Sequence, residues 1–523
     1  VKDINPGSGS SSPRDLTDVN GVLYFAADDG TNGRELWKSD GTAGGTVMVK
    51  DIRSGGGWSG SSSPSNLTVL NGVLYFVADD GTNGRELWKS DGTADGTVLV
   101  KDIYTGTSYG RPNSSSPANL TDMNGLLYFT AYDGTNGQEL WKSDGTGAGT
   151  VLVKNIRSGS GSSSPQNLTT VNSVLYFAAD DGTNGNELWK SDGTADGTVL
   201  VKDVYTGTNS SNPSYLTDVN GVLYFTANDG TDGAKLWKSD GTAGGTVLVK
   251  DIVRSAWGWD DFEFEGGGGG WMSNLTNVNG ALYFVANDGP HGYELWKSDG
   301  TTDGTVMIKD INTLTHHAHP SYLTEIDGML YFRAYDGVNG WELWKSDGTE
   351  GGTVLIKDIY PGVRIPSDDD YHHYMQGPNS SYPDDLTAVN GVLYFRADDG
   401  TNGGELWKSD GTEGGTVLVK DIYPGSSGDY TYSSYPRNLT VMNGVLYFTA
   451  NDGTNGEELW KSDGTAGGTV LVRDIRSGSG GSYPQNLVAV NGVLYFVADD
   501  GTNGRELWKS DGTAGGTVMV KDI

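Results

Sequence analysis

The stretch Glu35-Leu36-Trp37-Lys38-Ser39-Asp40-Gly41-Thr42 decides the fold, because it returns throughout the chain. Its ten copies carry their tryptophans at Trp37, Trp88, Trp141, Trp189, Trp237, Trp296, Trp344, Trp407, Trp460 and Trp508. Recurrence of this kind indicates one supersecondary unit used many times. The 523 residues are therefore expected to form one repeat domain, 1–523, rather than several unrelated domains.

Each repeat predicts four short β-strands separated by turns. In the first repeat, Asn20-Gly21 favours a hairpin, because both central residues of a type I′ turn need positive φ. Asp29-Gly30 and Asp40-Gly41 mark the next two reversals of the chain. Residues 22–27 are apolar without alternation, which indicates a strand that is covered on both faces.

A single four-stranded sheet cannot cover both of its own faces, so it needs a similar sheet on each side. A β-propeller of ten four-stranded antiparallel blades meets this requirement, and an open superhelical stack of blades is the alternative. The blade cores have constant length and are 16–52, 67–103, 120–156, 168–204, 216–252, 275–311, 323–359, 386–422, 439–475 and 487–523. Only the connection before each core varies in length, which predicts that the irregular residues gather on one face.

The signature Glu-Leu-Trp-x-x-Asp-Gly-Thr, followed by Gly-Thr-x-x-Val-Lys-Asp-Ile, resembles the ELWxxDGT repeat family of secreted bacterial proteins. The resemblance covers all ten repeats, with Lys235 in place of the Glu and Asn155 in place of the last Asp. The Ser-Asp-Gly-Thr turn is also faintly similar to the Asp-box hairpin of sialidase-like and sortilin-like propellers, without that motif's trailing aromatic. The family resemblance implies an extracellular, repeat-built β protein and no known reaction.

The composition excludes several classes of function. Net charge is −32, from 35 basic and 67 acidic residues, which argues against binding nucleic acid or an anionic membrane surface. The chain has no cysteine, so disulfides, thiol catalysis and Cys-ligated metals are excluded. No apolar run is long enough to insert into a membrane, and no signal-like segment opens the chain.

The chain begins with a spare copy of the fourth strand, made of Val1, Lys2, Asp3 and Ile4, although it also ends on a complete repeat. An unpaired edge strand is a template for pairing with another chain. The spare strand therefore predicts a homo-oligomer or polymer in which residues 1–4 associate with a neighbouring chain.

The recurring acidic residues have two interpretations. Asp28, Asp29 and Asn32, with their copies in the other repeats, could bind Ca²⁺ with backbone oxygens, or the aspartates could simply form turns before glycine. Glu35 and Lys38 predict either an ion-pair belt between blades or solvated edge residues of little energetic value.

Histidine is the least regular residue type in the chain. All six histidines fall in connections expected on one face, and residues 368–370 add three aspartates nearby. Imidazole with carboxylate suits Zn, Cu or Ni, and the alternative is ordinary loop residues. The candidate transition-metal ligands are His291, His316, His317, His319, His372 and His373.

Aromatic residues outside the repeat motif are expected on the same face. They predict an interaction surface for the chain itself or a partner, a platform for extracellular glycans, or loops that pack on themselves. The set is Trp58, Trp257, Trp259, Trp271, Trp341, Tyr371, Tyr374, Tyr430, Tyr432 and Tyr435.

Asn-Leu-Thr sequons recur at the start of many repeats, and they are surface acceptors where the source glycosylates such sites. They are Asn66, Asn119, Asn167, Asn274 and Asn438, and Asn-Ser-Ser sequons add Asn113, Asn209 and Asn379.

No nucleophile–base constellation recurs, and near-identical blades present near-identical residues to one another. The sequence therefore predicts a non-enzymatic, secreted structural or adhesive propeller that builds an extracellular assembly. A glycan-binding or ligand-binding module is the alternative. A hydrolase would require convergent carboxylates such as Asp260, Asp261, Glu263 and Glu265.

Overall fold

A computed structural model describes residues 4–5, 9–55, 60–231, 233–252, 272–314, 317–364, 377–428 and 430–520. Several residues singled out in the sequence lie outside these ranges. They are Val1, Lys2, Asp3, Trp58, Trp257, Trp259, Asp260, Asp261, Glu263, Glu265, Trp271, His316, the aspartates 368–370, Tyr371, His372, His373 and Tyr374.

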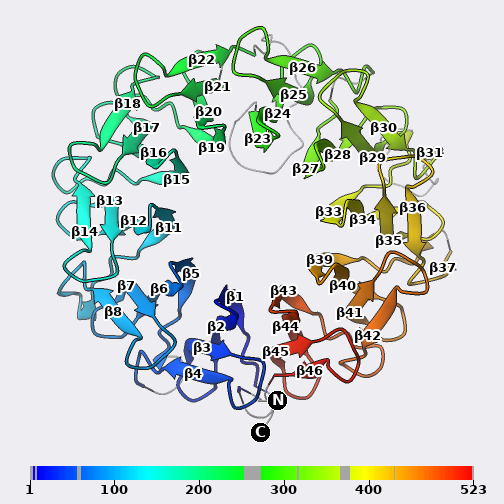
Figure 1. The fold of residues 1–523 in the computed structure, drawn as a ribbon, viewed down its shortest axis with the longest axis horizontal. Helices are drawn as coiled ribbons and strands as arrows, with labels where there is room; N and C mark the ends of the chain where they lie inside the picture. Colours follow the sequence, from blue (N-terminus) through cyan, green and yellow to red (C-terminus); the bar gives the residue numbers. More distant parts are fainter. Residues whose placement is uncertain are drawn as a thin grey trace. The chain divides into compact units, whose positions relative to one another are not determined.

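The described chain is all-β, with no α-helix, and it forms ten four-stranded antiparallel sheets whose strands follow chain order (Figure 1). The predicted fold class, a β-propeller of ten four-stranded antiparallel blades, is confirmed. The first strands of the blades are β1 (Arg14–Val19), β5 (Ser65–Leu70), β11 (Ala118–Met123), β15 (Gln166–Val171), β19 (Ser214–Val219), β23 (Met272–Val278), β27 (Ser321–Ile326), β33 (Asp384–Val389), β39 (Arg437–Met442) and β43 (Gln485–Val490).

The second strands are β2 (Val22–Asp28), β6 (Val73–Asp79), β12 (Leu126–Tyr132), β16 (Val174–Asp180), β20 (Val222–Asn228), β24 (Ala281–Asn287), β28 (Met329–Tyr335), β34 (Val392–Asp398), β40 (Val445–Asn451) and β44 (Val493–Asp499). The third strands, which carry the signature tryptophans, are β3 (Arg34–Ser39), β7 (Arg85–Ser90), β13 (Gln138–Ser143), β17 (Asn186–Ser191), β21 (Ala234–Ser239), β25 (Tyr293–Ser298), β29 (Trp341–Ser346), β35 (Gly404–Ser409), β41 (Glu457–Ser462) and β45 (Arg505–Ser510).

The fourth strands are β4 (Val47–Lys50), β8 (Val98–Lys101), β14 (Val151–Lys154), β18 (Val199–Lys202), β22 (Val247–Lys250), β26 (Val306–Lys309), β30 (Val354–Lys357), β36 (Val417–Lys420), β42 (Val470–Arg473) and β46 (Val518–Met519). Three connections carry small hairpins of their own, which are β9 (Thr107–Ser108) with β10 (Arg111–Pro112), β31 (Val363–Arg364) with β32 (Gly377–Pro378), and β37 (Ser426–Ser427) with β38 (Tyr430–Thr431).

Local sequence explains the register of each blade. Asn20 and Gly21 both have positive φ, 52° and 82°, as the predicted type I′ turn between β1 and β2 requires. The register of β1 against β2 shifts between Arg14 and Thr17, and Asp15 within that bulge has a φ of 58°. This left-handed bulge recurs at the start of each blade and positions the side chains described below.

The core lies between successive blades, which is why the second strand is apolar on both faces. In one cluster, Tyr24 and Leu36 of the first blade pack with Leu74, Phe76 and Trp88 of the second, and all five side chains are buried. Every signature tryptophan is buried. Each blade is therefore stabilised mainly by its neighbours.

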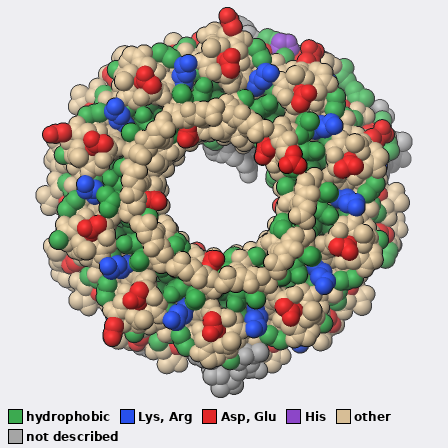
Figure 2. Space-filling view, viewed as in Figure 1, with side chains coloured by type: hydrophobic (Ala, Val, Ile, Leu, Met, Phe, Trp, Pro, Cys, Tyr) green, Lys and Arg blue, Asp and Glu red, His purple; other side chains and the backbone are tan. Residues whose placement is uncertain are grey.

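Contacts divide the chain into two compact units. The first comprises Val1–Pro165, Ile422–Pro424 and Ser434–Ile523, and the second comprises Gln166–Asp421 and Gly425–Ser433. No helix suited to crossing a membrane is found in the described part of the chain. On the face shown in Figure 2, the described acidic and basic side chains are interspersed with hydrophobic ones rather than gathered by sign.

The signature glutamate is a buried clamp, so neither sequence-based interpretation of Glu35 is correct. Glu35 is fully buried and accepts hydrogen bonds from the Ile52 N–H (3.0 Å), the Ser62 N–H (2.8 Å) and the Ser62 hydroxyl (2.5 Å). The clamp thus fixes the connection that leads to the next blade. Lys38 does not take part in this clamp. Hydrogen bonds from Thr93 lower the pKa of Asp91 in the next blade, and the charge of Lys38 adds to that effect.

The N-terminal segment enters the clamp of the last blade. Ile4 and Ser11 donate their N–H groups to Glu506, at 3.4 and 2.7 Å. Ile4 is 2% exposed and packs with Leu507 and Val520. The Ile4 N–H thus bonds to Glu506 of the last blade as the Ile52 N–H bonds to Glu35 of the first blade. Association of residues 1–4 with a neighbouring chain stays a prediction.

Candidate ligand-binding clefts

His291, one of the candidate metal ligands, replaces a structural asparagine. Its Nδ1 lies 2.7 Å from Asp288 Oδ2, as Asn32 Nδ2 lies 2.7 Å from Asp29 Oδ2 in the first repeat. The hydrogen bond with Asp288 raises the pKa of His291. The side chain thus closes the same turn that Asn32 closes.

The candidate calcium ligands are also engaged in turns. Asp29 accepts hydrogen bonds from the N–H groups of Thr31 and Asn32, and Asp28 accepts one from Gly30. Within the described ranges, no group of three or more His, Asp or Glu side chains could hold a metal ion. The metal predictions that use His316, His372 and His373 concern residues outside those ranges.

His317 and His319 join a stack of rings with Tyr293 and Trp341. Ring centroids are 5.0 Å apart for Tyr293 and His319, 5.2 Å for His317 and His319, and 6.2 Å for His319 and Trp341. Burial and the nearby His317 lower the pKa of His319 to about 4, so its ring is neutral at pH 7. The loop before β27 therefore packs His317 and His319 against Tyr293 of β25 and Trp341 of β29.

Tyrosines occupy two left-handed positions of the repeat that other blades fill with Asn, Asp or Ser. Tyr215 and Tyr322 stand where most other blades have Asn, and their φ values are 53° and 57°. Tyr382, Tyr435 and Tyr483 stand where the first four blades have Ser, with φ from 47° to 51°. All five side chains are about half exposed, between 46% and 55%. A bulky residue at positive φ is strained, and such strain is often associated with functional sites.

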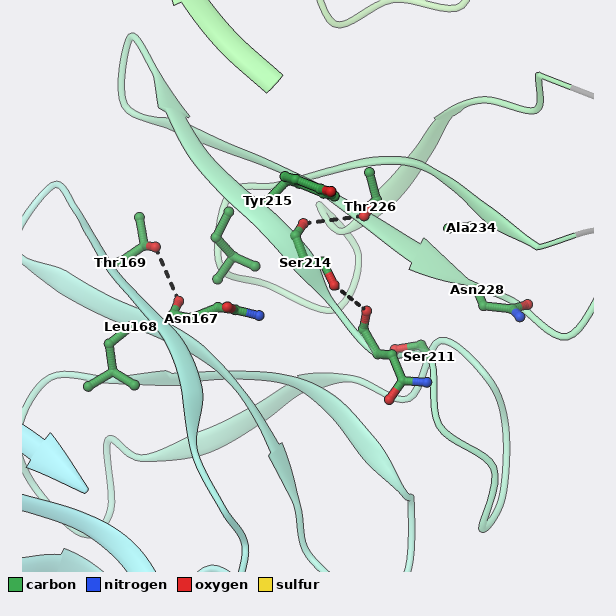
Figure 3. Close-up of a pocket in the computed structure, with 11 residues that line it drawn as sticks. Asn167, Leu168, Thr169, Ser211, Ser214, Tyr215, Thr226, Asn228 and Ala234 are labelled. Carbon is green, nitrogen blue, oxygen red and sulfur yellow. Dashed lines mark hydrogen bonds between the residues drawn. The ribbon is translucent and has the colours of Figure 1, made fainter. Parts of the chain in front are cut away.

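One tyrosine lines a cleft of about 790 Å³ in the second unit, which we name the Tyr215 cleft. Figure 3 shows Tyr215 and Ser214 of β19 between Asn167 on β15 and Asn228 at the end of β20. Among the remaining lining residues, Thr169, Ser211, Asn212 and Thr226 add hydroxyl or amide groups, whereas Leu168, Leu216 and Ala234 are apolar. Short polar side chains beside an exposed ring are suited to a polyhydroxylated ligand.

A second cleft of about 510 Å³ lies at corresponding repeat positions two blades further along the same unit. We name it the Tyr382 cleft, and its lining residues are Ser273, Val285, Tyr293, His319, Pro320, Ser321, Arg333, Trp341 and Tyr382. It therefore brings together His319 and Trp341 from the sequence-predicted sets.

Sequence reasoning missed Tyr382 and also Arg333, which lines the same cleft. Its guanidinium carbon lies 4.8 Å from the ring centre of Tyr322 and 5.0 Å from that of Trp341. Its Nε donates a hydrogen bond to Ser321 Oγ at 3.3 Å. The available signal was position, because only β28 and β34 carry Arg where the other second strands have Ala, Val or Thr.

The other predicted aromatic residues that the structure describes, which are Tyr430, Tyr432 and Tyr435, do not line these two clefts. Tyr430 lies on the small hairpin of β37 and β38 and is 82% exposed, whereas Tyr432 is partly buried. Tyr435 is half exposed and lies 5.7 Å from the guanidinium of Arg437.

The recurrent sequons serve the left-handed bulge. Asn66, Asn119, Asn167, Asn274 and Asn438 all have φ of 56° or 57°. Four of them donate from Nδ2 to the carbonyl of the next blade's proline, which is Pro117, Pro165, Pro213 or Pro484 respectively. Asn is favoured there because it tolerates this conformation. Glycosylation of these asparagines stays a prediction.

Comparison with known proteins gives no family. No family model matches the chain, and no curated protein matches it. Solved structures similar to it include a puromycin hydrolase (13% identity, TM-score 0.31, 76% of this chain and 60% of that chain). Others come from a study of two prolyl endopeptidases (12%, 0.33, 74% and 54%) and a Mycobacterium tuberculosis puromycin-hydrolysing peptidase (12%, 0.30, 76% and 60%).

These neighbours are peptidases, and they contradict the sequence-based prediction of a non-enzymatic structural or adhesive protein, which is withdrawn. That prediction assumed that near-identical blades leave no distinctive site, whereas the repeat is broken at Arg333 and at the tyrosines. The chain spans 54–60% of the length of these neighbours, and at 12–13% identity the likeness transfers no activity to it.

Proposed function

We propose that this chain binds carbohydrate through the Tyr215 and Tyr382 clefts. The observation that carries the proposal is the placement of half-exposed tyrosines at strained, left-handed positions beside two clefts, one with hydroxyl and amide side chains and the other with hydroxyl, aromatic and guanidinium side chains. An exposed ring can stack on the apolar face of a sugar, and short polar side chains can hydrogen-bond its hydroxyls. Folding alone gives no reason to place tyrosine there, since Asn and Ser serve the same turns in other blades.

Both clefts have volumes that suit one or two sugar rings, because ligand pockets commonly span about 300–1,000 Å³. The acidic surface and the resemblance to ELWxxDGT repeat proteins support an extracellular location for this binding, which forms part of the proposal.

The experiment is a glycan array followed by calorimetric titration of the oligosaccharides that bind. Tyr215→Asn and Tyr382→Asn each install a side chain that other blades use at the same position, so both variants should fold. Each should weaken binding by about tenfold at its own cleft, through loss of the stacking ring. Tyr109→Asn is the matched control, because Tyr109 also has positive φ, is fully exposed and lines neither cleft. An array without binders, or variants that bind as the parent does, would refute the proposal.

A further inference from the structure

We propose that the Tyr382 cleft is specific for an acidic sugar, with the carboxylate of a uronate bound by Arg333. This inference rests on the proposed function and names the ligand class of one of its two clefts.

Arg333 is an unusual residue for its position in the repeat. Arg333 stands on β28, at the strand position where eight of the ten blades carry Ala, Val or Thr. Those smaller side chains fill the same position in sheets of the same register, so the fold does not require a cation there. Arg333 is therefore an addition to the repeat rather than part of it.

The guanidinium of Arg333 is held by two aromatic rings and one hydroxyl. The rings of Tyr322 and Trp341 lie within 5.0 Å of its carbon, and Ser321 Oγ accepts from Nε. Two aromatic faces and one hydrogen bond fix the plane of the group, while its terminal NH₂ groups have no hydrogen-bond partner among the described residues. A fixed guanidinium plane is suited to bidentate binding of a carboxylate.

The positive charge of Arg333 has no carboxylate in direct contact among the described residues. Burial lowers the pKa of Arg333, and Asp384 opposes this effect from beyond ion-pair distance. A partly buried cation is normally paired, because desolvation without a partner costs free energy. His319, on the other wall of the cleft, is neutral at pH 7 and adds no second cation.

The next blade shows the same arrangement with its charge already neutralised. Arg396 on β34 stands where Arg333 stands on β28, and it forms an ion pair with Asp384. Asp384 occupies the repeat position of Ser321. The chain thus supplies a carboxylate for Arg396 and leaves the corresponding place beside Arg333 to a hydroxyl, which favours a carboxylate on the ligand.

The surroundings favour a sugar acid over a bare anion. Tyr382 offers a half-exposed ring at the rim of the cleft, and Ser273 and Ser321 add hydroxyls to its lining. A pyranose carboxylate presents a ring for stacking, hydroxyls for hydrogen bonding and a charge for Arg333. Sulfated sugars share the negative charge but lack the planar geometry that matches the guanidinium.

The test is calorimetric titration with a galacturonate trisaccharide, its methyl ester, the neutral galactose trisaccharide and a sulfated galactose trisaccharide. The protein should bind the acid about 10- to 100-fold more tightly than the methyl ester. Arg333→Gln should remove that preference without changing affinity for the neutral trisaccharide, and Arg396→Gln, the matched control, should retain it.

Each other outcome is informative. Equal binding of the acid and its methyl ester overturns the inference while carbohydrate binding stands, and this comparison uses the unaltered protein. Tighter binding of the sulfated sugar overturns the assignment of a carboxylate. Absence of binding to all four sugars, and to every glycan of an array, removes the proposed function and the inference together.

Discussion

Left-handed backbone positions decide which residue types the repeat accepts without strain. The repeat needs a residue with φ near +50° at two places before or within the first strand of each blade. Asn and Ser are the usual occupants, and Tyr in those places costs conformational free energy. A strained tyrosine that is also half exposed contributes little to the core.

Tyr382→Asn should therefore stabilise the fold while it weakens the binding of carbohydrate. The expected gain is up to about 1 kcal/mol, because Asn adopts the left-handed conformation more readily than Tyr. Thermal unfolding of the purified variant measures the change, and Asn212→Tyr at the corresponding position of the fifth blade should shift the melting temperature in the opposite direction. A lower melting temperature for Tyr382→Asn would show that the ring is a structural residue.

The signature tryptophans act as buried anchors whose indole N–H makes little difference. Trp141 is 6% exposed, and its Nε1 has no hydrogen-bond partner. Trp141→Ala should lower the free energy of unfolding by about 3–5 kcal/mol. Trp141→Phe should cost clearly less, since it keeps an aromatic ring and loses no hydrogen bond. Comparable losses in the two variants, measured by denaturant titration, would contradict this account of the tryptophan.

Sequence reasoning reached only part of the candidate site at the residue scale. His319 and Trp341 were identifiable because His and Trp are rare outside the motif. Arg333 and Tyr215 escaped notice because their meaning depends on the repeat position that they occupy. Alignment of the repeats against one another would have shown both, whereas the sandwiching of Arg333 between two rings requires the structure.

At the scale of the element, the buried signature glutamate of a blade holds the connection that follows that blade. In the sixth blade, Ala318 stands where other connections carry the clamping serine, so Glu294 lacks a hydroxyl partner. Burial raises the pKa of Glu294 to about 8, and that of the serine-bound Glu35 to about 7. Burial rather than the missing hydroxyl accounts for this value, because the pKa of Glu342, which accepts a hydrogen bond from Ser381 Oγ, is also raised to about 8.

Ala318→Ser should supply that missing hydrogen bond and stabilise the sixth blade by about 1 kcal/mol. Ser163→Ala is the matched reciprocal change, because Ser163 Oγ donates to Glu139 at 2.5 Å and its loss should destabilise by a similar amount. Thermal unfolding of both variants checks the pair. If both substitutions shift the melting temperature in the same direction, the hydroxyl is not what completes the clamp.

The clamps also predict how stability depends on pH. Burial raises the pKa of Glu35, Glu86 and Glu458 from 4.5 to about 7, and that of Glu294 and Glu342 to about 8. The folded protein therefore binds more protons than the unfolded chain between pH 4.5 and 8. Their stabilising contribution is complete below pH 4.5 and is lost as pH rises through 7 to 8.

Melting temperature should accordingly fall between pH 5.5 and pH 8.5. His319 opposes this trend only at the acid end, because its lowered pKa makes stability rise with pH up to about 6.5. Scanning calorimetry across the range provides the measurement, and Glu458→Gln should reduce the slope. A melting temperature that is constant or rises over this interval would contradict the assignment of raised glutamate pKa values.

At the scale of the whole molecule, the net charge of −32 opposes compaction through self-repulsion. Salt screens such repulsion, with a Debye length of about 10 Å at 0.1 M. The melting temperature should therefore rise when NaCl increases from about 20 to 300 mM, measured at constant pH. A fall would instead indicate that the local pairs, such as Lys235 with Asp229 and Asp251, outweigh the net repulsion.

The blades of the whole chain were predictable because one period, one hairpin signal and one apolar strand recur without change in length. The location of Ile4 was not predictable, since the chain contains many copies of the same Val-Lys-Asp-Ile strand and the sequence pattern alone cannot choose among partners. Burial of Ile4 beside Leu507 identifies the last blade as its partner. The division of contacts into two compact units likewise has no counterpart in a uniform repeat.

The contact of Ile4 and Ser11 with Glu506 has a consequence for biosynthesis. The ribosome makes Glu506 about 500 residues after Ile4, so the isoleucine emerges long before the glutamate that accepts its N–H. Each blade core can form within its own short stretch as it emerges, whereas this contact must wait for the blade that carries Glu506. At about 5–20 residues per second, Ile4 remains without this partner for roughly 25–100 seconds. Keeping Ile4 from other contacts during that time is thus a task for which the nascent chain depends on the blades already made or on chaperones.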